Sequence, residues 1–174
     1  VDKLDFHEFL NFALQPLASN DAEMLKSLHQ EFMEKHIKPI MTRRGKDLIA
    51  KHRREGDHPV IITATNSFVT GPIAQAFGVH DLIATEPEIV DGEYTGKVKG
   101  IPCFQQGKIE RLHAWLNETK IEFNNSWFYS DSHNDMPLLE EVAHPIAVDP
   151  DDQLRAIASE RGWQITSFRS QHQG

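Results

Sequence analysis

From Pro59 onward, short apolar runs alternate with helical stretches, and this alternation is the feature that most constrains the fold. Val60-Ile61-Ile62-Thr63 is the first run, and it is apolar on both faces, as expected of a strand covered by helices on both sides. Later runs predict strands over 81–85, 127–130, 146–148 and 163–166, with helices over 67–77 and 151–161 and from residues 108 and 137. Gly78 and Gly162 are expected to end two of these helices, and Asp91-Gly92 predicts a β-hairpin. The pattern predicts an α/β fold in which helices flank a parallel sheet.

The residues before this region predict helices only. Apolar residues recur at helical spacing at Met24, Leu25, Leu28 and Phe32, and Asn20 followed by Glu23 predicts the start of that helix. Another helix is predicted over 42–54. We therefore divide the chain into a helical segment of residues 1–57 and an α/β core of residues 58–174. Because no Pro-, Gly- or Ser-rich linker separates them, one compact unit is expected.

Charge and composition limit the partners. The net charge of -8 argues against nucleic acid, because no basic surface is available to neutralise a string of phosphates. No apolar run approaches the roughly 20 residues that a bilayer span requires, so no membrane association is predicted. Cys103 is the single cysteine, which fits a reducing compartment and predicts the cytoplasm.

Thr63-Ala64-Thr65-Asn66 follows the first predicted strand and is the first candidate site. A hydroxyl group and successive backbone N–H groups at a strand-to-helix turn can bind the oxygens of a phosphate. The alternative is ordinary capping of the next helix by Asn66 or Ser67.

Lys108 is the second candidate, at the start of a predicted helix. A lysine there can neutralise charge on a phosphoryl group in transfer, although most lysines at helix starts point into water. A cation in the first helical turn opposes the helix dipole, which slightly favours the functional interpretation.

Asp131-Ser132-His133-Asn134-Asp135 is the third candidate, directly after an aromatic strand. Two carboxylates flanking a tight turn are ligands of the kind that Mg²⁺ takes, together with waters and a phosphate oxygen. The alternative is a turn stabilised by Asp and Asn side chains, with Asp135 capping the next helix.

Taken together, these three segments resemble motifs two, three and four of the haloacid dehalogenase (HAD) superfamily. The Asp91-Gly92-Glu93-Tyr94-Thr95-Gly96 segment and the closing Ala158-Ser159-Glu160-Arg161-Gly162-Trp163 segment are similar to subfamily IB, which includes phosphoserine phosphatases. The resemblance covers roughly residues 30 to 168.

The resemblance implies a Rossmann-like HAD core with a truncated helical cap, and it assigns a role to each candidate residue. Thr63 and the Ala64 N–H would bind phosphoryl oxygens, with Thr65 and Asn66 in the same phosphate-binding segment. Lys108 would steady the negative charge, and Asn134 would reach toward the substrate. The metal residues would be Asp131, as a direct Mg²⁺ ligand, and Asp135, in support of the metal shell. The partner implied is a small phosphorylated metabolite, and the resemblance predicts no oligomeric state.

The family's first motif, DxDx[T/V], does not occur in these 174 residues. Neither Asp2-Lys3-Leu4-Asp5 nor Asp149-Pro150-Asp151 has its spacing and context. We therefore expect the chain to begin after the strand that carries the nucleophilic aspartate. The full-length parent would be a Mg²⁺-dependent phosphatase acting through an aspartyl-phosphate intermediate, whereas the chain as given would be inactive. The alternatives are a non-catalytic phosphate- or metal-binding relative and a fragment completed by another polypeptide.

Other enzyme classes lack their motifs. The sequence contains no G-x-S-x-G elbow, no phosphate-binding G-x-x-x-x-G-K-[ST] loop and no dinucleotide-binding glycine pattern. Its ten histidines fall in no zinc-binding spacing.

Overall fold

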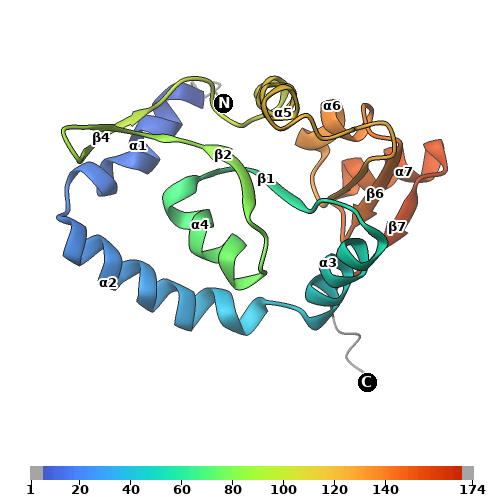
Figure 1. The fold of residues 1–174 in the computed structure, drawn as a ribbon, viewed down its shortest axis with the longest axis horizontal. Coiled ribbons are helices and arrows are strands. Elements are labelled where there is room, and N and C mark those ends of the chain that lie inside the picture. The colour runs from blue at the N-terminus through green and yellow to red at the C-terminus, as the bar shows by residue number, and fades with distance from the viewer. Residues whose placement is uncertain (1–5, 170–174) are drawn as a thin grey trace. The chain divides into compact units, whose positions relative to one another are not determined.

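Parallel strands connected by helices confirm the predicted α/β class in the computed structural model, which describes residues 6–169 (Figure 1). The described residues divide into two compact units, so the expectation of one compact unit is wrong. One comprises the residues up to Met41 together with His52–Cys103, and the other comprises Thr42–Lys51 together with the residues from Phe104 onward. The division into a helical segment of residues 1–57 and a core of residues 58–174 concerns a cap and a core, which the compact units do not test. It stays a prediction.

The N-terminal part is helical, as predicted. Its elements are α1 (Phe6–Ala18), α2 (Ala22–Phe32), a π-helical turn η1 (Met33–Ile37), a 3-10 turn η2 (Lys38–Ile40) and α3 (Arg43–Glu55). The predicted capping by Asn20 is wrong. Asp21 caps α2 by accepting a hydrogen bond from the Met24 N–H at 2.8 Å, whereas the Asn20 amide donates to the Pro16 carbonyl. A carboxylate one residue later satisfies the free N–H group equally well.

Strand β1 (Val60–Asn66) pairs in parallel with β2 (Asp81–Thr85), and α4 (Ser67–Ala76) connects them. Helix α4 ends as predicted at Gly78, whose φ of +69° suits a residue without a Cβ atom. The hairpin predicted at Asp91-Gly92 is also confirmed, because β3 (Pro87–Val90) and β4 (Glu93–Val98) are antiparallel around it.

Helix α1 packs along β4, as Figure 1 shows. Leu14, Leu17 and Leu25 are buried there, against side chains that include Tyr94 and Val98. Gly96 permits this close approach: a Cβ atom built on it would lie 2.7 Å from the Gln15 amide nitrogen, and its φ is +77°.

Replacing Gly96 with alanine is therefore expected to destabilise the helix–hairpin contact by about 1–2 kcal/mol, because a left-handed residue with a Cβ atom is strained and Gln15 must move. Gly92→Ala is the matched control, since Gly92 also has a positive φ but no atom within 4 Å of an added Cβ. Amide hydrogen exchange of α1 measures the effect. Equal losses in both variants would contradict a role for the close approach.

The other unit contains a parallel sheet in the order β5 (Trp127–Ser130), β6 (His144–Val148) and β7 (Gln164–Thr166). Its helical elements are α5 (Gln106–Thr119), the 3-10 turn η3 (His133–Asp135), α6 (Met136–Leu139) and α7 (Asp152–Arg161). Leu139, Ala147, Leu154 and Ala158 form its buried core, with Phe128, Met136 and Trp163 packed around them. These elements confirm the predicted strands and helices.

Within the described residues, every helix is too short or too polar to cross a lipid bilayer. Residues 2–5, which were compared with the first HAD motif, lie outside this described part of the chain.

Candidate active site

Thr63 lies in β1, where the pairing with β2 becomes irregular. Thr63 is paired with Ala84 and Asn66 with Thr85, so Ala64 and Thr65 lie between two consecutive partners of β2. Such a bulge takes residues out of the regular ladder and is common beside active sites. The irregular segment is the one predicted to bind phosphate.

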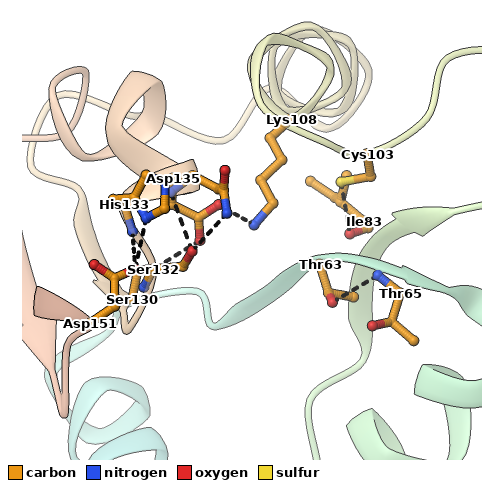
Figure 2. Close-up of polar contacts among 11 residues, drawn as sticks. Thr63, Thr65, Ile83, Cys103, Lys108, Ser130, Ser132, His133, Asp135 and Asp151 are labelled. Atoms are coloured by element: carbon orange, nitrogen blue, oxygen red, sulfur yellow. Dashed lines mark hydrogen bonds and ion pairs between the residues drawn. The ribbon is translucent and has the colours of Figure 1, made fainter. Parts of the chain in front are cut away.

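The side chains of this segment organise its backbone. The Thr63 hydroxyl oxygen accepts a hydrogen bond from the Thr65 N–H at 3.2 Å (Figure 2), and a hydroxyl that accepts one bond can still donate its own proton. The Asn66 side chain accepts a bond from the Val69 N–H at 3.0 Å and so caps α4, which confirms the capping alternative for Asn66.

Lys108 is buried at the start of α5 and forms an ion pair with Asp135. Its ammonium nitrogen lies 2.5 Å from Asp135 Oδ1, and the Ser130 hydroxyl donates to Asp135 Oδ2 at 2.8 Å (Figure 2). The side chains of Lys108 and Asp135 are only 8% and 12% exposed, so the pair is largely removed from water. The structure therefore excludes the interpretation that Lys108 points into water. The ion pair links Lys108, in the segment that resembles motif three, to Asp135, in the segment that resembles motif four.

The backbone immediately before α5 is strained. Gln105 has a φ of +45° and a ψ of -118°, a combination that residues with side chains rarely adopt. It lies three residues before Lys108, so the strain sits at the turn that starts the lysine's helix.

The loop of residues 131–135 is ordered by its own hydrogen bonds. The Ser132 hydroxyl oxygen accepts bonds from the backbone and side-chain N–H groups of Asn134, each at 3.2 Å, and the Ser132 N–H donates to Ser130 at 3.2 Å. Asp131 is exposed, whereas Asp135 is buried. The two predicted metal residues thus have different environments in one short loop.

Asp151 connects this loop to α7. Its Oδ2 atom accepts bonds from the backbone N–H of His133 at 2.8 Å and from His133 Nδ1 at 2.9 Å, while Oδ1 accepts from the Leu154 N–H at 2.8 Å. Burial opposes ionisation of Asp151, but the bonds from Leu154 and His133 outweigh it and lower the pKa of its carboxyl group to about 2. The carboxylate is therefore an acceptor at neutral pH, so His133 Nδ1 carries the proton.

The donor atoms of the loop suit Mg²⁺. Asp131 offers an exposed carboxylate, and Asp135, with both oxygens hydrogen-bonded, lies four residues away. Magnesium takes one or two carboxylates and keeps several waters, so this set fits the ion with Asp131 as the direct ligand. A group of three potential ligands within 4.8 Å of one another, His52, Glu55 and Asp57, lies elsewhere, before the start of β1.

The predicted residues thus fall in both units. The phosphate-binding candidates Thr63, Ala64, Thr65 and Asn66 belong to the first unit, and Lys108, Asp131, Asn134 and Asp135 belong to the second. Ser130 and Asp151 bind Asp135 and His133 through hydrogen bonds, and neither was predicted as a site residue. An aspartate at the start of the helix predicted over 151–161 is a capping signal, but the second role of Asp151 as acceptor for His133 depends on the fold.

Comparison with known proteins identifies the family. The model of the haloacid dehalogenase-like hydrolases matches residues 2–140. The chain belongs to this family. The match confirms the resemblance that motifs two to four indicated.

The relatives of this HAD hydrolase include named phosphatases. It is 41% identical over 170 residues to a histidinol-phosphatase of Neisseria meningitidis, covering 95% of this chain and 77% of that protein. It is 31% identical over 157 residues to the phosphoserine phosphatase SerB1 of Mycobacterium tuberculosis, covering 90% of this chain but only 51% of that one. A crystal structure of a protein of unknown function from Bordetella pertussis Tohama I has 44% identity and a TM-score of 0.93, covering 97% of this chain and 77% of its own.

Proposed function

We propose that this HAD hydrolase is the greater part of a Mg²⁺-dependent phosphatase that acts on small phosphate monoesters through an aspartyl-phosphate intermediate. The observation that carries the proposal is the buried Lys108–Asp135–Ser130 network next to the exposed Asp131. A cation fixed in a water-poor position acts strongly on nearby charge because the local dielectric constant is low. The names of the phosphatase relatives agree with this chemistry.

Each residue has a proposed task. Thr63 donates its hydroxyl proton, and Ala64 its backbone N–H, to oxygens of the phosphoryl group, while Thr65 and Asn66 shape that segment. Lys108 offsets negative charge on the phosphate and its attacking carboxylate, and Asn134 contacts the substrate. Asp131 holds the metal, and Asp135 fixes Lys108. Bound Mg²⁺ would supply further neutralisation of the phosphoryl oxygens.

The substrate and its setting are part of the proposal. Phosphoserine and histidinol phosphate are the two monoesters suggested by the relatives' names. We also propose a cytoplasmic location, in agreement with the single cysteine, and no association with nucleic acid, in agreement with the net charge of -8.

A second candidate function is non-catalytic binding of phosphate or metal. It is favoured by one observation: the 174 residues contain no DxDx[T/V] sequence to provide the nucleophile. Under this candidate, or if another polypeptide provides the strand, residues 1–174 alone do not turn over substrate.

An assay with a generic aryl phosphate tests the proposal. We expect no turnover by the 174-residue chain, and Mg²⁺-dependent turnover by the longest product of the same gene, abolished by a chelator. Turnover by the short chain would refute its proposed inactivity. A longer product that carries the motif and still lacks turnover would favour the binding function.

A further inference from the structure

Asp151 makes an unusual number of contacts with the proposed metal loop for a residue that is 20 positions away from Asp131. One carboxylate oxygen binds both the backbone N–H and the ring nitrogen of His133, at 2.8 and 2.9 Å. The Asp151 backbone N–H donates to the carbonyl oxygen of Asp131 at 2.8 Å. The loop is thus held at its first and third residues by a single amino acid, and Figure 2 shows the contact with the third, His133.

The same residue is anchored on its other side. Its remaining carboxylate oxygen caps α7 through the Leu154 N–H at 2.8 Å, and Leu154 is fully buried in the core of this unit. The cap therefore ties Asp151 to a rigid element. The loop of residues 131–135, which is bonded to Asp151, is therefore positioned by α7 and the core as well as by its own five residues.

We propose that Asp151 is a positioning residue that holds the loop of residues 131–135 in the conformation in which Asp131 can bind a divalent cation, an inference that rests on the proposed metal role of Asp131. Asp151 itself does not touch the ion. Its effect passes through the Asp131 carbonyl and through His133, which donates to one of its carboxylate oxygens. Residues that orient metal ligands from outside typically alter metal affinity by about 10–100-fold.

Ordinary helix capping is the competing explanation, and the two carboxylate oxygens allow it to be separated. Asp151→Asn retains an oxygen for the Leu154 N–H, and asparagine caps helices as well as aspartate does. It replaces the other oxygen by an NH₂ group, which cannot accept from His133. The variant therefore preserves the cap and the backbone bond to Asp131, and it removes the side-chain acceptor for His133.

Asp21→Asn is the matched control. Asp21 caps α2 with the same kind of bond, 2.8 Å from the Met24 N–H, but belongs to the other compact unit. Both substitutions remove one negative charge from a helix start, so the loss of the helix-dipole contribution is common to them. His133→Ala is a third variant, which removes only the ring contact and is expected to give a smaller effect than Asp151→Asn.

The test is an NMR titration of the ¹⁵N-labelled 174-residue chain with MgCl₂, combined with amide hydrogen exchange. We expect Asp151→Asn to raise the Kd for Mg²⁺ about tenfold and to increase exchange of the His133 N–H about tenfold, with neither change in Asp21→Asn. A Kd for Asp151→Asn within twofold of wild type overturns the positioning role.

Failure of the proposed function gives a different result. If the wild-type loop does not respond to Mg²⁺, Asp131 is not a metal ligand in this chain. Hydrogen exchange then decides whether Asp151 positions the loop: faster exchange in Asp151→Asn supports the role, and unchanged exchange overturns it.

Discussion

Lys108→Met is expected to lower the free energy of unfolding by about 3–5 kcal/mol at neutral pH, because it leaves the Asp135 carboxylate buried without its cation. Methionine has nearly the length of lysine, so the effect does not come from a large cavity. All three tryptophans, Trp115, Trp127 and Trp163, lie in the same unit as Lys108. Urea unfolding followed by tryptophan fluorescence therefore measures the stability of that unit.

The double variant Lys108→Met/Asp135→Asn separates charge from packing. A neutral amide needs no cation, so we expect it to recover most of the loss, as replacement of a whole buried ion pair often does. Lys46→Met is the control, because Lys46 is exposed in α3 and its loss should cost less than about 0.5 kcal/mol. A double variant no more stable than Lys108→Met would contradict the ion-pair explanation.

Asp131→Asn is expected to have a large effect on turnover and almost none on stability. In a polypeptide of this gene that hydrolyses aryl phosphate, we expect kcat to fall about 10³-fold, equivalent to roughly 4 kcal/mol of transition-state stabilisation. Because Asp131 is exposed, this substitution should change the free energy of unfolding of the protein by less than about 0.5 kcal/mol.

Asp152→Asn and Asp135→Asn complete the comparison. Asp152 is an exposed carboxylate at the start of α7, so its removal should leave both turnover and stability near wild type. Asp135→Asn should lower both, because Asp135 holds the buried Lys108. Turnover and urea unfolding of the three variants measure these effects. Wild-type kcat in Asp131→Asn would contradict its assignment as the metal ligand.

The secondary structure of the core could be predicted from the sequence because its signals are local. The apolar run at Val60, the Asp91-Gly92 turn and Gly162 after α7 each depend on a few neighbouring residues, and each prediction is confirmed. The cap of α2 was misplaced by one residue, because Asn20 and Asp21 are both good capping residues and only the backbone decides between them.

The site could be predicted in part, for a physical reason. The resemblance to the HAD motifs predicted that Lys108 and Asp135 lie close together, and their ion pair shows that the two side chains meet. Burial of that pair, the hydroxyl bond from Ser130 and the bonds from Asp151 to His133 all join residues distant in sequence or depend on side-chain direction. The spacing of apolar residues along the sequence does not predict such contacts. The convergence of Thr63 with Lys108 and Asp131 stays a prediction.

The strained backbone at Gln105 affects how this position can change in evolution. A glycine would adopt its φ of +45° and ψ of -118° without strain, so a single substitution would stabilise this turn. The same substitution would loosen the direction in which the next helix leaves the turn, and with it the aim of Lys108. At position 105, a substitution that raises stability is therefore expected to lower turnover.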